Sequence, residues 1–175
     1  MSYLNDEHYI ERVLQGDHSS YAMLVERHKE MVFTLAYRML KNREEAEEVA
    51  QDAFVKAYSS LKKFRKDSRF STWIYRIVYN LSVSQLRKKK KQTQSLDDDE
   101  RGLELEDTHQ KMDRLEQDDR KKFIQQALAS LSHDEQTIIT LYYQDDLPVG
   151  EIADITQMTS SNVKVKLHRA RKRLH

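Results

Sequence analysis

The stretch EIADITQMTSSNVKVKLHRARKRLH, residues 151–175, decides the fold of the C-terminal end of this chain. Its apolar start predicts a short helix, Gln157 and Met158 break that helix, and Thr159 or Ser160 caps a second one. Between positions 164 and 173 the second helix carries six basic residues and no acidic one. One buried stripe is expected on it at helical spacing, formed by Val163, Leu167, Ala170 and Leu174. Two helices around a tight turn, the second of them basic, are typical of a helix-turn-helix that binds DNA.

The composition of the 175 residues favours helices and excludes several classes of protein. There is no cysteine, so we expect neither disulfides nor a cysteine-based zinc site. Three glycines and one proline are too few for a sheet rich in turns. No apolar run approaches the ~20 residues of a membrane span, and the N-terminus lacks a signal-peptide pattern. The sequence therefore predicts an all-α, cytoplasmic protein with no direct membrane insertion.

Charge is strongly segregated along the chain, although the net charge is only +1. Residues 62–91 hold eleven basic residues and one acidic residue, and residues 160–175 hold six basic residues. Between these blocks, residues 92–119 hold eleven acidic residues against three basic ones. Two basic blocks on either side of an acidic segment predict two separate contacts with a polyanion.

Hydrophobic periodicity and capping residues divide the chain into two helical parts. Gly16 is expected to end the first helix, Ser19 or Ser20 to cap the second, and Ser132 with Glu135 to form a capping box. Helices are expected near 6–15, from about 20 to 41, from about 44 to 61, over 71–90, near 116–130 and over 133–143, ahead of the C-terminal pair. Residues 92–115 are acidic and poor in apolar residues, which is typical of a flexible linker. We therefore expect two small helical domains, 1–91 and 116–175, joined by a flexible acidic linker.

The third expected helix has two very different faces. One is an apolar stripe in which alanines allow another helix to approach closely, formed by Ala46, Ala50, Ala53, Phe54, Ala57 and Leu61. The opposite face is charged and includes Glu45, Glu48, Asp52 and Lys56, with Gln51 at its border. It can be a solvated surface, which the spacing alone favours, or a docking surface for a protein partner.

Aromatic and basic residues alternate over positions 62–79, as a surface that holds single-stranded nucleic acid requires. Taken singly, Phe70 and Trp73 are better explained as core residues, and Phe64 and Tyr75 as exposed ones. The basic run from Arg87 to Lys91 can simply favour the helix end, but beside this loop we favour contact with duplex phosphate.

Three segments together resemble an extracytoplasmic-function (ECF) sigma factor: EEAEEVAQDAFVKAY at 44–58, FRKDSRFSTWIYRIVYN at 64–80, and LHRARKRL at 167–174. The similarity covers most of the chain apart from the linker, and the three motifs in this order are highly specific. The resemblance implies a sigma region 2 domain and a sigma region 4 domain. It also implies a function: directing core RNA polymerase to promoters, recognising their −10 and −35 elements and assisting melting.

The resemblance also implies roles for individual residues. Contact with the clamp helices of the polymerase's largest subunit falls to Glu48, Gln51, Asp52 and Val55. Together with the aromatic and basic pattern, the resemblance gives −10 DNA-binding candidates: Phe64, Arg65, Lys66, Tyr75, Arg76, Asn80, Arg87 and Lys88. Candidates for −35 DNA lie on the last helix, outside its buried stripe: Ser161, Asn162, Lys164, Val165, Lys166, His168, Arg169 and Lys172. The body of region 4 is expected to bind the flap of the second-largest subunit, and an anti-sigma factor is a further expected partner.

Some positions depart from the family pattern, and these concern promoter preference and not the fold. Gln157 and Asp146 stand where glycine is usual, and Pro148 where serine is. Ser84 replaces a common aspartate, and Val165 replaces a small polar residue.

Other functions have less support in the sequence. Three isolated glycines cannot form a phosphate-binding loop, and the only Glu-x-x-His pair, Glu106 with His109, lies in the expected linker. We therefore expect no catalytic residue, no metal site and no cofactor. A Mg²⁺-dependent nuclease could in principle use the carboxylates of 44–52, which a divalent-ion titration with a cleavage assay would test. A simple DNA-binding regulator is the other alternative, and it should bind duplex DNA tightly without polymerase.

Overall fold

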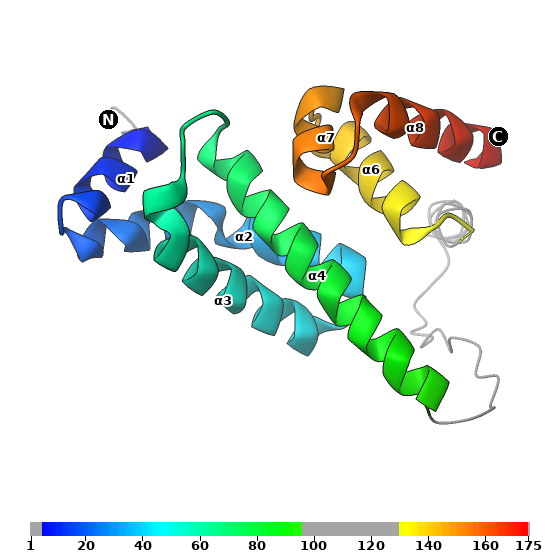
Figure 1. Cartoon of the computed structure of the whole chain (residues 1–175), viewed down its shortest axis with the longest axis horizontal. Helices are drawn as coiled ribbons and strands as arrows, with labels where there is room; N and C mark the ends of the chain where they lie inside the picture. The colour runs from blue at the N-terminus through cyan, green and yellow to red at the C-terminus, as the bar shows by residue number, and fades with distance from the viewer. Residues whose placement is uncertain (1–4, 96–129, 175) are drawn as a thin grey trace, which may run out of the picture.

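The computed structural model describes residues 5–95 and 130–174, and every regular element in these ranges is helical (Figure 1). Its elements are α1 (Asp6–Leu14), η1 (His18–Ser20), α2 (Tyr21–Leu40), α3 (Arg43–Ser60), η2 (Leu61–Lys63), α4 (Phe70–Ser95), α6 (His133–Tyr143), α7 (Val149–Thr156) and α8 (Ser160–Leu174). The helix expected near 116–130 and most of the expected linker lie outside the described residues. No described helix has both the length and the apolar character that crossing a membrane requires.

Helices α1–α4 form the N-terminal domain, in which α2, α3 and α4 pack against one another (Figure 1). The alanine stripe of α3 is buried as expected, and Ala46, Ala53 and Ala57 are fully inaccessible. Asn42 caps α3 by accepting a hydrogen bond from the Glu45 N–H at 3.0 Å. Because the alanine side chains are short, α3 lies close to its neighbours, and its charged face points to solvent.

The start of α2 differs from the expected serine cap. Ser20 precedes the helix, but its hydroxyl donates to Asp17 Oδ2 at 2.8 Å and makes no cap hydrogen bond. The chain enters α2 through the short η1 turn instead. Gly16 follows α1 with φ +104°, so the expected glycine stop after the first helix is confirmed.

Helices α6, α7 and α8 form the C-terminal domain, and α7 and α8 are the expected helix-turn-helix. The capping box is confirmed, because Ser132 accepts from the Glu135 N–H and Glu135 accepts from the Ser132 N–H. The turn at Gln157 is confirmed too, with a left-handed φ of 58°. Three of the four expected stripe residues of α8 are buried: Val163, Leu167 and Ala170. The side chain of the fourth, Leu174, lies outside the described part.

Helix α4 begins at Phe70 and continues to Ser95, beyond the expected end at Lys90. Residues Gln92–Ser95 contain neither glycine nor proline, so nothing local stops the helix. Near this end, Lys89 Nζ lies 2.7 Å from Glu45 Oε1, which ties the basic end of α4 to the start of α3.

The two domains contact each other where α7 packs against α4 (Figure 1). The contact is partly polar. Thr72 Oγ1 donates to Glu151 Oε2 at 2.9 Å, and Tyr79 Oη donates to Asp134 Oδ1 at 3.1 Å. The Arg38 guanidinium lies 3.3 Å from Asp145 Oδ1. Residues from α2 and α4 of the first domain therefore meet carboxylates of the second.

Tyr75 corrects one expectation, because it is 5% exposed and does not reach solvent. Burial, followed by the nearby charge of Asp145, raises the pKa of its phenol. The hydrophobic pattern of α4 alone could not reveal this, because the groups beside Tyr75 include Asp145 of the other domain. Phe70, at 3% exposed, and half-buried Trp73 contribute to the core as expected.

Candidate nucleic-acid and polymerase interface

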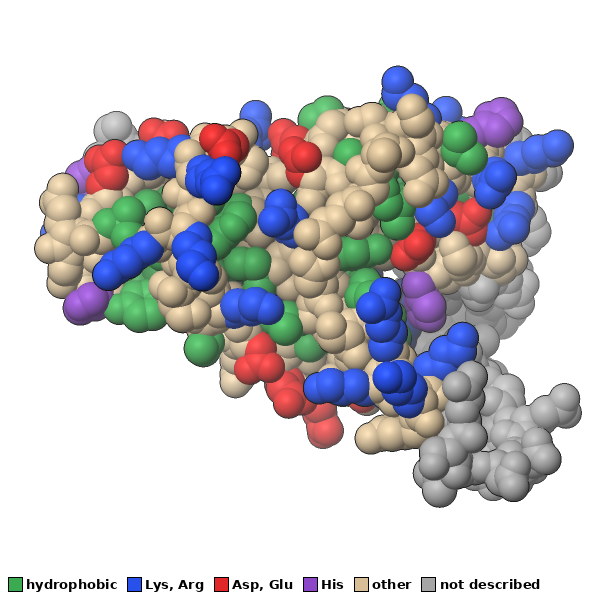
Figure 2. All heavy atoms as spheres, viewed as in Figure 1, with side chains coloured by type: hydrophobic (Ala, Val, Ile, Leu, Met, Phe, Trp, Pro, Cys, Tyr) green, Lys and Arg blue, Asp and Glu red, His purple; other side chains and the backbone are tan. Residues whose placement is uncertain are grey.

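The outward face of α3 is acidic and solvent-exposed. Glu48, Gln51 and Asp52 are all exposed, and the apolar side chain of Val55 is 69% exposed on the same helix. Figure 2 shows acidic side chains gathered at the edge of the molecule over α3. An exposed apolar residue beside carboxylates on a rigid helix can pack against a partner whose surface is basic at its rim.

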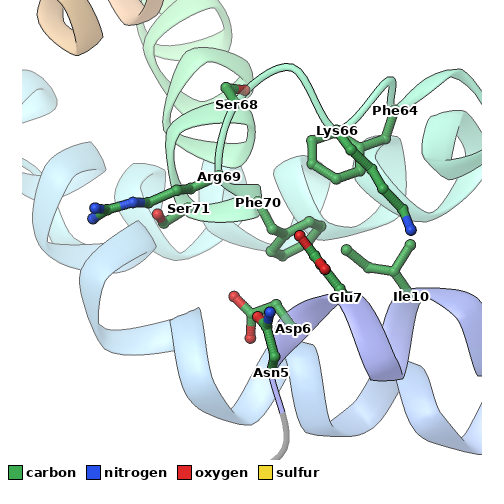
Figure 3. A pocket seen from close by; sticks show the side chains of 10 residues that line it. All are labelled: Asn5, Asp6, Glu7, Ile10, Phe64, Lys66, Ser68, Arg69, Phe70 and Ser71. Carbon is green, nitrogen blue, oxygen red and sulfur yellow. The ribbon is translucent and has the colours of Figure 1, made fainter.

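The loop between η2 and α4 closes one side of a pocket of about 290 Å³ (Figure 3). Its apolar part includes the Phe70 ring, Ile10 and the half-buried Phe64. The Phe64 ring packs edge-on to Phe70 with 6.1 Å between centroids, and lies 5.1 Å from Trp73. The aromatic cluster thus anchors the loop and leaves part of the Phe64 ring accessible.

Lys66 ties this loop to α1. Its Nζ lies 2.8 Å from Glu11 Oε1, and its backbone is left-handed with φ 60°. The hydrogen bond raises the pKa of Lys66 and lowers that of Glu11. A lysine in the left-handed region is conformationally costly, so a tertiary contact that holds it is consistent with a functional loop.

The polar rim of the pocket comes from both chain segments that form it. On the loop side, Ser68, Arg69 and Ser71 line it, and on the other side Asn5, Asp6 and Glu7 of the α1 end do (Figure 3). Asp6 is engaged, since its two carboxylate oxygens lie 2.8 Å from Arg27 and 2.8 Å from His28. An apolar floor with a few polar groups at the rim is the usual character of a small ligand site.

The predicted −10 DNA-binding residues on the loop and along α4 differ in how far they are exposed to solvent. Arg65, Arg76, Arg87 and Lys88 are exposed, and Asn80 is half-buried. Figure 2 shows Lys and Arg side chains gathered over the end of α4. The structure therefore leaves a basic surface along α4 accessible to solvent. Among the predicted −10 residues, Tyr75 is the one that is buried.

The exposed face of α8 carries nearly all of the predicted −35 residues. Val165 is 46% exposed despite being apolar, and its neighbours on this face are exposed as well: Ser161, Asn162, Lys164, His168, Arg169 and Lys172. Val163 and Leu167 point the opposite way, into the domain core. A basic helix that presents one continuous face behind a turn has the geometry to lie in a major groove.

Two cations of α8 pair with carboxylates of α6: Lys166, which was expected to be free for DNA, and Arg173, whose side chain stays more than half exposed. Lys166 Nζ lies 3.4 Å from Asp134 Oδ2, with 24% of its side chain exposed. Arg173 donates to the nearly buried Glu135 at 2.9 Å. The carboxylates of the preceding helix α6 therefore hold two of the six α8 cations, which the sequence of α8 alone could not show.

Glu135 is a buried carboxylate of the C-terminal domain, only 5% exposed. Burial alone would raise its pKa, but hydrogen bonds from Ser132 and the charges of Arg173 and Lys166 outweigh burial and lower it. The capping box and the α6–α8 contact therefore share one carboxylate.

The pocket residues of α1 were not predicted from the sequence as site residues. The α1 segment has an amphipathic pattern that indicates only a packed helix, and Asn5 and Glu7 are single polar residues at its start. Only the approach of the loop around Lys66 brings them into one site. Over 5–95 and 130–174, the structure has no group of three or more potential metal ligands, the carboxylates of α3 included.

Two family models match the chain. The one described as Sigma-70 region 2 matches residues 24–92, and the one described as Sigma-70, region 4 matches residues 122–174. Together they cover α2–α4 and α6–α8, the elements that carry the two surfaces described above.

Curated relatives are similar over nearly their whole length. The ECF RNA polymerase sigma factor SigW of Bacillus subtilis is 35% identical over 173 residues, covering 94% of this chain and 92% of the relative. The RNA polymerase sigma-H factor of Pseudomonas aeruginosa is 31% identical, covering 95% and 90%. The ECF RNA polymerase sigma-E factor of Escherichia coli is 31% identical, covering 96% and 91%.

Two solved structures share the fold. CnrH in complex with the cytosolic domain of CnrY superposes with a TM-score of 0.68 at 20% identity, covering 97% of this chain and 94% of that one. The sigma factor RpoE in complex with the anti-sigma factor NepR, from Bartonella quintana, gives a TM-score of 0.67 at 22% identity, covering 88% and 93%. At this identity the likeness concerns the arrangement of helices.

Proposed function

The chain belongs to the ECF family of RNA polymerase sigma factors, and on that premise we propose which of its surfaces perform each step of transcription initiation. It directs core RNA polymerase to specific promoters and acts by binding and strand separation, with no bond chemistry of its own. We divide it into a region 2 domain at 1–91, a linker at 92–115 and a region 4 domain at 116–175. The matches at 24–92 and 122–174 support this division.

The outward face of α3 is the polymerase contact. Glu48, Gln51, Asp52 and Val55 meet the clamp helices of the largest subunit, and the body of region 4 meets the flap of the second-largest subunit. The exposed Val55 among acidic residues supports the first assignment, because a solvated surface gains nothing from an exposed valine.

The loop from Phe64 to Phe70 and the exposed face of α4 contact the −10 element. An unpaired base of the non-template strand enters the pocket and stacks on its aromatic wall. The cations Arg65, Arg76, Arg87 and Lys88 follow the phosphates, because backbone charge provides most of the affinity for DNA. Tyr75 takes part only when the C-terminal domain moves away from α4.

The exposed face of α8 contacts the −35 element in the major groove. Lys164 and Val165 lie near the helix start, where a recognition helix touches base edges. Arg169 and Lys172 lie further along and contact phosphate, which fixes orientation but carries no sequence information. Ser161, Asn162 and His168 complete this face, and Lys166 joins it if its pairing with Asp134 opens.

Core polymerase and promoter DNA are the partners of this mechanism, and the cytoplasm is its location. An anti-sigma factor is a further partner, as the fold shared with the Bartonella quintana sigma factor in its anti-sigma complex suggests. Such a partner would act by covering the polymerase-binding face of α3 or by holding the two domains together.

One observation carries the proposal: both family models match this chain, in order along the sequence. The two matched domains present an acidic face on α3 and a basic face on α8. The test is transcription reconstituted from the purified chain, core polymerase and a pool of genomic DNA, followed by mapping of the RNA start sites. Defined starts that share −10 and −35 sequences support it. Tight duplex binding without polymerase, and no transcription with it, would indicate a simple regulator instead.

A further inference from the structure

One wall of the base pocket comes from α1, which lies outside the residues matched to Sigma-70 region 2. The loop wall contributes the Phe64 and Phe70 rings, Ser68, Arg69 and Ser71. The α1 wall contributes Ile10 to the apolar floor and Asn5, Asp6 and Glu7 to the rim. Figure 3 shows the Glu7 carboxylate pointing from α1 towards the loop, beside the Phe70 ring. A carboxylate at this position would contact the edge of a flat ligand that stacks on the aromatic rings.

Two charged groups near Glu7, those of Asp6 and Lys66, are already committed to other contacts. Asp6 is held by Arg27 and His28, each at 2.8 Å. Lys66 is held by Glu11 at 2.8 Å, and the charge of Glu7 contributes only a minor part of the rise in its pKa. Glu7 is exposed, so its oxygens are accessible to a ligand that enters the pocket.

A carboxylate accepts hydrogen bonds and donates none, so it discriminates between bases. Cytosine and adenine present an exocyclic amino group, and guanine presents an amino group beside a ring N–H. Thymine has no amino group: its one ring N–H lies between two carbonyl oxygens, and the carbonyl that replaces the amino group of cytosine would face the carboxylate unfavourably. The cavity of about 290 Å³ is at the lower limit of ordinary ligand pockets, which suits a single base better than a larger molecule.

We propose that Glu7 of α1 selects the unpaired −10 base in this pocket, accepting a hydrogen bond from its amino group and disfavouring thymine. This inference rests on the proposed function, because it assumes that the pocket holds a promoter base. It adds a specificity residue from a helix that carries no assigned role. Lys66 and Glu11 act as a positioning pair, which holds the loop at the distance from α1 that Glu7 requires.

The test uses holoenzyme assembled from the full chain and core polymerase. Its probes are promoter fragments whose non-template −10 positions are randomised one at a time, and bound fragments are sequenced. With the unmodified chain, one position should disfavour thymine by about fivefold to a hundredfold, the range of a single good base contact. Glu7→Gln can both donate and accept, so it should reduce this bias at that position only. Glu7→Lys, which only donates, should abolish the bias against thymine, since every base offers an acceptor to it.

Two matched variants make the result specific. Glu30→Gln removes an exposed carboxylate on α2, outside the pocket, and should leave every base preference unchanged. Glu11→Gln releases Lys66, so it should weaken binding and also reduce the bias against thymine, because the loop is no longer held at the distance that Glu7 requires. Unchanged base preference in both Glu7 variants, with promoter opening intact, would overturn the role of Glu7 and leave the proposed function standing. Failure of the unmodified holoenzyme to open any promoter would overturn the proposed function and this inference with it.

Discussion

At the scale of single residues, two left-handed positions show where this chain departs from its family's pattern. Asp146 and Gln157 adopt φ values of 50° and 58°, and both stand where glycine is usual. A left-handed L-residue costs about 1–2 kcal/mol because its Cβ crowds the following carbonyl oxygen. The turn geometry is therefore kept although the glycine is not, and the helix-turn-helix is held in place by its packing.

Replacing Gln157 with glycine should stabilise the C-terminal domain. The strain disappears, but glycine loses more chain entropy on folding, so we expect a net gain of about 1 kcal/mol in unfolding free energy. Urea denaturation of the full chain measures it. Gln144→Gly is the matched control, because Gln144 ends α6 in a right-handed conformation and gains nothing from glycine. Equal effects at both positions would contradict strain at Gln157.

A second residue-scale prediction concerns the carboxylate of Glu135. Its pKa is lower in the folded chain than its ordinary 4.5, so it stabilises folding fully above that value. The stabilisation is lost as the pH falls through the lowered pKa. Glu135→Gln keeps a side chain able to cap the helix but removes the charge that meets Arg173 and Lys166. The variant should melt at a lower temperature than the parent at pH 7, and the two melting temperatures should converge towards pH 3. A difference that stays constant over this range would show that the charge is unimportant.

At the scale of elements, α3 and α8 are built in the same way, with one buried stripe and one exposed face for which a binding role is proposed. Alanines bury one side of α3, while Val163, Leu167 and Ala170 bury one side of α8. Because the proposed binding residues lie on the opposite side, they can be changed without disturbing the core. Mutations on these faces therefore separate binding from stability.

Charge reversal on α3 should remove polymerase binding and leave the fold intact. In Glu48→Arg/Asp52→Arg both positions are exposed, so each change should alter stability by only about 0.5 kcal/mol. Helicity and melting temperature should stay nearly unchanged, while affinity for core polymerase falls in a pull-down or interferometry measurement. Glu30→Arg on α2 reverses a comparable exposed charge away from this face and should retain binding. Normal core binding by the double variant would refute the docking assignment.

Two classes of substitution on α8 should have different effects. Lys172→Ala should weaken holoenzyme binding across promoter sequences and reduce the slope of log affinity against log salt by about 1, because one phosphate contact is lost. Lys164→Ala or Val165→Ala should change which −35 bases are preferred, by about 1–3 kcal/mol for a good contact. Binding to a −35 mutant library at several salt concentrations measures both effects. If base preference survives substitution at both Lys164 and Val165, this face does not recognise sequence.

At the scale of the whole molecule, the two domains lie against each other through the contact between α4 and α7. The −10 and −35 elements are about 25 base pairs apart, or roughly 85 Å at about 3.4 Å per pair. Here α7 contacts α4, and the contact withdraws Tyr75 from solvent. Polar contacts between the domains include Thr72–Glu151, which joins α4 to α7, together with Tyr79–Asp134 and Arg38–Asp145. Because the two elements are far apart on the DNA, we expect region 4 to leave α4 when both are bound.

Separation of the two domains can be followed by energy transfer between two dyes attached to introduced cysteines, because the chain has no cysteine of its own. Ser59→Cys on α3 and Asp154→Cys on α7 place labels on exposed positions of the two domains. Transfer should be efficient in the free chain and fall when core polymerase and promoter are added. Asp145→Asn/Glu151→Gln weakens the contact between the domains, so it should lower the transfer efficiency of the free chain. The effect should be slight, since a partly exposed ion pair contributes about 1 kcal/mol or less. Equal transfer in the free and promoter-bound states would contradict opening.

The sequence alone predicted the parts of this protein that depend on local order. The helix-turn-helix, the Ser132–Glu135 capping box, the glycine stop at Gly16 and the alanine stripe of α3 are all confirmed. Helical periodicity and capping act over a few residues, so they can be recognised without a structure. The family itself was recognisable from three motifs for a similar reason, because its contact residues lie on single helices and one loop.

Contacts between distant segments were decided only by the tertiary structure. The sequence does not indicate that Asp134 and Glu135 hold Lys166 and Arg173, that Tyr75 lies close to Asp145, or that Glu7 faces the loop around Lys66. Each of these depends on which helices pack together. Side-chain patterns show which face of a helix is buried, but not which residues of another element lie against it. That choice is made by the packing of whole helices, and it determines which predicted charges remain free to bind DNA.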